Sequence, residues 1–105
     1  MKEKLLQIIN HYRVIPQLKY FQSEVFELNE AIISAEHSRC VGITRDVAPI
    51  CIEHIAEEIA DVVVMLKQFQ YYYGITDEEI INNMQFKIKR QLERIENEKS
   101  NNISS

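Results

Sequence analysis

The sequence EEIADVVVML, residues 57–66, gives the clearest indication of the fold. From Ile59 onward it is apolar except for Asp61, and the flanks of its β-branched run Val62–Val64 have helical spacing. A helix that is apolar almost all round belongs in the interior of a domain. The stretch therefore predicts a central helix that is the most buried of the chain and carries two carboxylates, Glu58 and Asp61.

Helical spacing continues outward from this stretch in both directions. Apolar residues at intervals of three and four predict helices over about residues 2–13, 16–37 and 49–73, whereas residues 38–48 break the pattern and predict a loop. A fourth helix is marked by Thr76 followed three residues later by Glu79, which is the pattern of a capping box. No segment alternates with a period of two over a useful length. The sequence thus predicts an all-α domain of the four-helix-bundle kind.

Length and composition set the expected organisation. A chain of 105 residues predicts one domain, which we place at residues 1–96, followed by a polar, disordered tail at 97–105. So small a domain buries a limited fraction of its surface, which favours completion by a partner subunit.

Charge and hydropathy narrow the classes of function. The net charge of −4 argues against a general nucleic-acid binder. No apolar run approaches the roughly 20 residues of a membrane span, and no signal peptide is evident. The spacing of Cys40 and Cys51 matches no metal or redox motif, so we expect reduced thiols and a cytoplasmic protein.

Four carboxylates form the main candidate site. Glu24 and Glu27 are three residues apart on one predicted helix, and Glu58 and Asp61 repeat that spacing on another, so each pair shares a helix face. Two unit charges 4 Å apart repel by roughly 4 kcal/mol at an effective dielectric of 20, and a divalent cation would relieve this repulsion. Oxygen ligands suit Mg²⁺ or Mn²⁺ rather than zinc. The alternative, ordinary solvated helix faces, stays open at this point.

Iron is the competing metal for carboxylates in a helical bundle. Di-iron sites use a Glu-x-x-His motif on two helices, and none of His11, His37 and His54 has a glutamate three positions before it. The sequence therefore disfavours a di-iron centre.

A basic stripe follows on the last predicted helix. Lys87, Arg90 and Arg94 share one face, with Asn83 one turn earlier. Such a row could hold phosphate oxygens. The alternative is a solvated face that pairs with neighbouring glutamates or balances the end of the helix.

The runs EVFELNEAI, residues 24–32, and EEIADV, residues 57–62, resemble the signature of the all-α NTP pyrophosphatase superfamily, the MazG-like proteins. The segment KIKRQLERI, residues 87–95, resembles that family's basic last helix. The resemblance implies that Mg²⁺ is bound by Glu24, Glu27, Glu58 and Asp61, and that substrate phosphates contact Lys87, Arg90 and Arg94. Many relatives have an asparagine two residues before the lysine. Gln85 stands there in this chain, with Asn83 two residues earlier, so either could contact the base or sugar.

The resemblance implies hydrolysis of a (d)NTP to a (d)NMP and pyrophosphate, with Glu24 or Glu27 activating water, in a homodimer or homotetramer. This activity would suit the clearance of surplus or non-canonical nucleotides. Two alternatives remain open: a non-catalytic helical module that dimerises, and a phosphoribosyl-ATP pyrophosphohydrolase.

Overall fold

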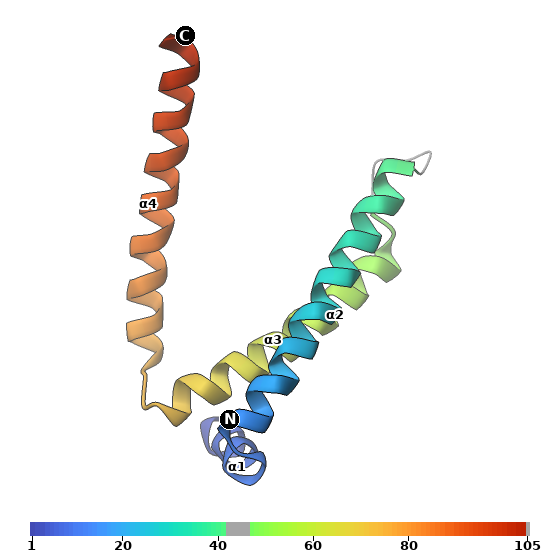
Figure 1. Ribbon diagram of the computed structural model, residues 1–105, viewed down its shortest axis with the longest axis vertical. Coiled ribbons are helices and arrows are strands. Elements are labelled where there is room, and N and C mark those ends of the chain that lie inside the picture. Colours follow the sequence, from blue (N-terminus) through green and yellow to red (C-terminus); the bar gives the residue numbers. More distant parts are fainter. Residues whose placement is uncertain (42–46, 105) are drawn as a thin grey trace. The chain divides into compact units, whose positions relative to one another are not determined.

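The computed structural model describes residues 1–41 and 47–104, and every regular element within them is a helix (Figure 1). The helices are α1 (Lys2–Tyr12), α2 (Val14–Val41), α3 (Pro49–Tyr72) and α4 (Asp77–Ser104). The all-α class predicted from the sequence is therefore confirmed. None of these helices combines the length and the apolar character that a bilayer crossing requires.

The chain divides into two compact units, Met1–Tyr73 and Gly74–Ser105. The boundary between the units falls inside the single domain that the sequence predicts for residues 1–96. That these residues form one domain remains a prediction. Gly74 has a φ of 70°, a left-handed conformation that glycine adopts without steric strain. A glycine at this point thus permits a left-handed backbone conformation directly after α3.

The first unit is built on α2 and α3, which run antiparallel and side by side (Figure 1). Phe21 on α2 and Phe69 on α3 meet edge to face, with ring centroids 5.8 Å apart and planes at 86°. This geometry matches the preferred electrostatics of aromatic pairs. Pro49 begins α3 at a position where its missing N–H leaves no intrahelical bond unmade.

A single residue, Arg13, separates α1 from α2. Its N–H donates to the carbonyl of Ile9 at 2.8 Å, which ends α1, and its carbonyl accepts from the N–H of Gln17 at 3.1 Å, which starts α2. Arg13 holds a φ of 75° and ψ of 160°, a region that is essentially restricted to glycine. The sequence predicts a wider gap, with the second helix beginning at Pro16. The structure instead includes Pro16 in the first turn of α2, where backbone N–H groups need no helical partner.

The buried face of α2 differs from the face on which large apolar residues recur at the helical spacing that predicts this helix. Leu18, Val25 and Ile32 have that spacing and are exposed. Three buried positions, Gln17, Glu24 and Ala31, each lie one residue before an exposed one, and Ala35 is buried one turn further on. Two of the buried positions are thus small alanines, and the larger apolar side chains lie on the flank of the helix.

The middle of α3 is also more exposed than the sequence predicts. Ile59, Val63, Val64 and Leu66 are each between 43% and 49% exposed, whereas Met65, Gln68 and Gln70 are buried. Within the first unit α3 packs against α1 and α2. Two neighbouring helices leave one face of a uniformly apolar helix uncovered, and the prediction that this stretch is the most buried part of the chain is therefore wrong for this unit.

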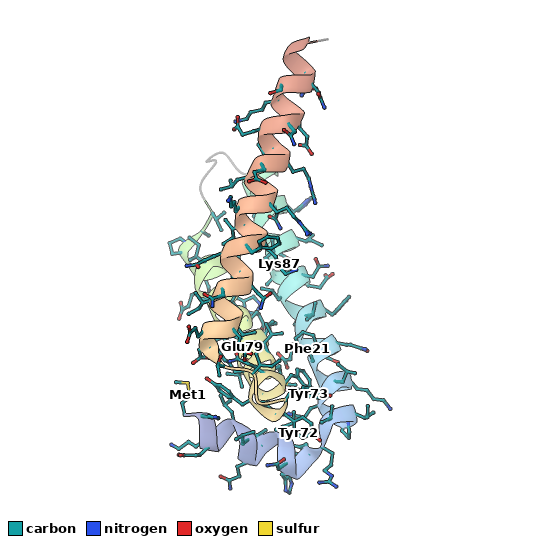
Figure 2. All side chains as sticks on the ribbon, turned by 90° about the vertical axis from the view of Figure 1, so that its left-hand side faces the viewer. Met1, Phe21, Tyr72, Tyr73, Glu79 and Lys87 are labelled. Carbon is teal, nitrogen blue, oxygen red and sulfur yellow. The ribbon has the colours of Figure 1, made fainter. Side chains whose placement is uncertain are left out.

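The second unit is the helix α4 with its leading turn. The predicted capping box is present: the N–H of Thr76 donates to Glu79 Oε2 at 2.7 Å, and the N–H of Glu79 donates to Thr76 Oγ1 at 3.1 Å. Figure 2 shows Glu79 in the first turn of α4 and Lys87 further along the same helix. α4 continues to Ser104 and so includes most of the segment 97–105 for which the sequence predicts disorder.

The predicted loop at 38–48 is shorter in the structure. α2 continues through Ser38 to Val41, and Val47 and Ala48 precede α3 without helical structure. The rest of the predicted loop, residues 42–46, lies outside the described residues, as does the side chain of Cys40. Cys51 is a half-buried free thiol.

Candidate functional site

Three of the four predicted carboxylates meet between α2 and α3. Glu24, Glu27 and Glu58 each present a carboxylate oxygen, and these oxygens all lie within 4.8 Å of one another. The antiparallel register explains the meeting, because residue numbers rise along one helix as they fall along the other. Three carboxylate oxygens this close together could hold one metal ion, and oxygen ligands suit hard divalent cations.

Burial makes this cluster different from an ordinary acidic surface. Glu24 is 5% exposed and Glu58 is half-buried, while Glu27 is exposed. Oε2 of Glu24 and Oε2 of Glu58 are both inaccessible to solvent and have no hydrogen-bond partner among the described residues. Buried polar atoms almost always have a partner, and a bound ion is one of the few explanations when the protein supplies none. The donor set therefore fits a hard divalent cation.

The electrostatic environment of Glu58 also favours a bound cation. Burial raises the pKa of the Glu58 carboxyl above its ordinary value, and the negative charges of Glu27 and Asp61 raise it further. His54, which is exposed on α3, lowers the pKa of Glu58, and Glu24 adds a smaller upward effect. Glu58 thus lies in a field that favours either a proton or a cation at its carboxylate.

The fourth predicted ligand, Asp61, lies outside the group of three. It is exposed and lines the same pocket as Glu24. Its charge acts on Glu58 and on Tyr20, whose pKa it helps to raise. Asp61 is therefore electrostatically part of the site, although its carboxylate is not among the three clustered groups.

Tyr20 is a site residue that the sequence did not single out. Hydrogen bonding to Glu24 and the charge of that carboxylate raise the pKa of the Tyr20 hydroxyl, and burial, Asp61 and Glu27 add to the effect. Tyr20 precedes Glu24 by four residues on α2, so the two share a face. That spacing was the available signal, but a tyrosine one turn from a glutamate is common on helix surfaces.

The predicted phosphate-binding residues all lie on α4. Lys87, Arg90 and Arg94 are exposed, and Asn83 donates from its Nδ2 to the carbonyl of Glu79 at 2.8 Å. These residues belong to the second unit and the carboxylates to the first. The role of the basic stripe and of Asn83 in binding phosphate or sugar stays a prediction.

Comparison with known proteins does not assign the chain to a family. No model of a known protein family matches the chain, and no curated protein or solved structure resembles it closely enough to count as a match. The function must therefore be argued from the site itself.

Proposed function

We propose that this chain is a Mg²⁺-dependent nucleoside triphosphate pyrophosphohydrolase of the all-α, MazG-like type. It would hydrolyse a (d)NTP to a (d)NMP and pyrophosphate. The observation that carries the proposal is the pair of buried oxygens of Glu24 and Glu58 that have no hydrogen-bond partner within residues 1–41 and 47–104, grouped with the carboxylate of Glu27. The sequence resemblance of residues 24–32, 57–62 and 87–95 to that family supplies the choice of reaction.

Glu24, Glu27 and Glu58 would hold the cation, with Asp61 as the fourth ligand. Mg²⁺, or Mn²⁺ in its place, would neutralise phosphate charge and acidify a bound water. Because Glu24 and Glu58 come from facing helices, the protein would present its ligands on rigid elements, which is how a precise site is maintained.

One carboxylate of α2 would orient the attacking water or accept its proton. Glu24 and Glu27 are the candidates for this role. Glu27 is exposed, so its carboxylate can reach water from bulk solvent, whereas Glu24 is buried beside Tyr20. General-base catalysis requires such contact with the water that is activated.

The basic stripe of α4 would neutralise the leaving pyrophosphate. Arg90 and Arg94 can form forked hydrogen bonds with phosphate oxygens, and Lys87 offers a point charge. Asn83 would lie near the sugar or base. Assembly of α4 with the carboxylate helices, as a four-helix bundle within one chain or within a homodimer or homotetramer, is part of the proposal.

The direct test is a panel of NTPs and dNTPs with millimolar Mg²⁺, with pyrophosphate release as the readout. We expect pyrophosphate from at least one nucleotide and a higher melting temperature with Mg²⁺ than with a chelator, since a cation that binds the folded state stabilises it. Absence of both effects would contradict the proposal. Phosphoribosyl-ATP belongs in the same panel, because its hydrolysis would identify the alternative substrate.

The basic stripe is tested by charge removal. Replacing Lys87 and Arg90 by alanine should raise KM for the nucleotide, because two phosphate contacts are lost. Lys89→Ala is the matched control, since Lys89 is an exposed cation on another face of α4. Equal effects of the two changes would remove the stripe from the site.

The rival function is a non-catalytic module that dimerises through its helices. It is favoured by the apolar side chains along α4 that are exposed in the described structure, namely Ile81, Met84, Ile88, Leu92 and Ile95. Such a module would self-associate without any dependence on Mg²⁺ and would release no pyrophosphate from the panel.

A further inference from the structure

A pocket of about 590 Å³ opens beside the carboxylates, between α1, α2 and α3. Its volume lies within the roughly 300–1,000 Å³ that is typical of small-molecule sites. Ile8 and Val64 contribute apolar walls, and Tyr12 and Tyr20 contribute aromatic rings. The pocket thus has walls that suit a flat, mainly apolar group.

Two buried carboxamides give this pocket a polar end. Gln17 is 7% exposed and Gln68 is 1% exposed, and Nε2 of Gln17 donates to Oε1 of Gln68 at 2.8 Å. Both Nε2 groups also lie near the thioether of Met65, at 3.9 and 3.7 Å. A thioether is a weak acceptor, so a carbonyl oxygen that entered the pocket would be a better partner for Gln68.

The polar end and the carboxylates are a fixed distance apart along the helices. Gln17 precedes Glu24 by seven residues on α2, and Gln68 follows Asp61 by seven residues on α3, with all four lining the pocket. Seven residues of α-helix rise about 10 Å. This separation leaves room for a sugar between a group at the carboxamides and a phosphate at the carboxylates.

The charge of the lining excludes an anion from the pocket itself. Among the described residues that line it, the acidic side chains are Glu24 and Asp61, and none is lysine or arginine. A phosphate would be repelled here unless a cation accompanied it at the carboxylates. The apolar and aromatic part therefore suits a group without negative charge.

We propose that this pocket binds the uncharged heterocyclic base of the nucleotide, and that the Gln17–Gln68 pair selects the base through its amide-like edge. A carboxamide pair that is joined by one hydrogen bond keeps further donor and acceptor capacity, which complements the C=O and N–H groups of a base. The inference rests on the proposed function for the identity of the ligand as a nucleotide. It makes Gln17 and Gln68 the residues that determine specificity.

The test uses nucleosides, which carry the base without phosphate, and the full chain without added metal. Side-chain NH₂ signals of Gln17 and Gln68 are followed by NMR as each of the common ribo- and deoxyribonucleosides is titrated to millimolar concentration. We expect these signals to shift for the preferred base. If no nucleoside moves either signal, because the pocket is closed or is filled by protein, the proposal is overturned.

The first variant removes the hydrogen-bonding edge and keeps the volume. Gln17→Leu combined with Gln68→Leu replaces both partners together, a change that is often nearly neutral for stability. We expect the affinity for the preferred nucleoside to fall about tenfold or more, the equivalent of one hydrogen bond to a buried polar group, and the preference among bases to disappear. Unchanged affinity and preference would overturn the proposal.

A second variant tests the pocket without touching the carboxamides. Val64 lines the pocket at 43% exposure, and its neighbour Val63, at 44% exposure, does not line it. Val64→Trp should fill the cavity and abolish the nucleoside-induced shifts, while Val63→Trp on the same helix should preserve them. Equal behaviour of the two tryptophan variants would overturn the proposal.

The two proposals can fail separately. Nucleoside binding that depends on Gln68, without any pyrophosphate release from the nucleotide panel, supports the base pocket and contradicts the hydrolase. Pyrophosphate release that has the same kcat/KM and base preference in the double leucine variant supports the hydrolase and contradicts the base pocket.

Discussion

At the scale of single residues, Glu58 has the largest expected effect on the stability of the protein and on its dependence on pH. Its buried Oε2 has no hydrogen-bond partner in the part of the chain that the structure describes, and its pKa is raised by burial and by neighbouring carboxylates. In the absence of metal the charged form is therefore less stable in the fold than in the unfolded chain. A group of this kind makes the metal-free protein sensitive to pH.

We predict that Glu58→Gln abolishes pyrophosphate release and raises the melting temperature of the metal-free chain. A folded-state pKa above the unfolded value means that folding favours the proton. The destabilisation by Glu58 is therefore absent below the ordinary carboxyl pKa of about 4.3 and grows as pH rises through the raised pKa. The difference in melting temperature between the variant and the wild type should accordingly widen from pH 4 to pH 7 in a chelator.

Glu57→Gln is the matched control for this change. Glu57 precedes Glu58 on α3 and is exposed, outside the group of clustered carboxylates. It should leave both pyrophosphate release and the pH dependence close to those of the wild type. A Glu58→Gln variant with normal turnover would refute its assignment as a metal ligand.

Arg13 offers a separate prediction about stability. Its positive φ strains a non-glycine residue by roughly 1–3 kcal/mol. A glycine at this position would avoid the strain, but its more flexible backbone would cost about 0.5–1 kcal/mol more conformational entropy on folding. Arg13→Gly should therefore raise the free energy of unfolding by about 1 kcal/mol in a urea titration. Gln7→Gly, inside α1 and exposed, should lower it by a similar amount. A destabilised Arg13→Gly variant would mean that the arginine side chain contributes more than its backbone strain removes.

At the scale of helices, the capping box stabilises the start of α4 through contacts between residues only three positions apart. Thr76 and Glu79 satisfy each other's backbone N–H groups, and loss of such a cap typically destabilises a helix by about 1 kcal/mol. Thr76→Ala should therefore speed amide exchange in the first turn of α4, and Thr76→Ser should restore the wild-type rate. Identical amide exchange rates in all three proteins would show that the cap does not stabilise the helix.

The helices also show which features of the fold can be predicted from the sequence alone. Thr76 and Glu79 could be identified because a cap depends on residues three positions apart. The break at Arg13 could not, because an arginine in a glycine-like conformation has no local signature. The burial of Glu24 could not be predicted either, because the large apolar residues Val25 and Ile32 are exposed while Glu24 and two small alanines are buried.

The same limit applies to the site. Spacing was sufficient to pair Glu24 with Glu27 and to relate both to Glu58. It could not find Gln17 and Gln68, because a buried carboxamide is indistinguishable from a surface one until its partner on another helix is known. The burial and partners of these residues depend on packing between segments about 50 residues apart.

At the scale of the whole molecule, the exposed apolar side chains of α4 predict self-association. Contiguous apolar surface of this kind usually marks an interface. We expect sedimentation to give a dimer or tetramer, and Ile88→Glu combined with Leu92→Glu to shift the protein toward the monomer. Lys99→Glu is the control, because Lys99 is an exposed cation that lies 3.6 Å from Glu96 near the end of α4. A wild-type protein that sediments as a monomer would contradict this prediction.

The carboxylate cluster joins two helices that are far from each other along the chain. A cation held by Glu24, Glu27 and Glu58 would act as a tether across the middle of α2 and α3, with no covalent bond involved. Hydrogen exchange would register this tether as slower opening of amides in the centre of both helices. The amides of α1 and α4 would keep their metal-free rates, so the pattern of protection alone would locate the ion.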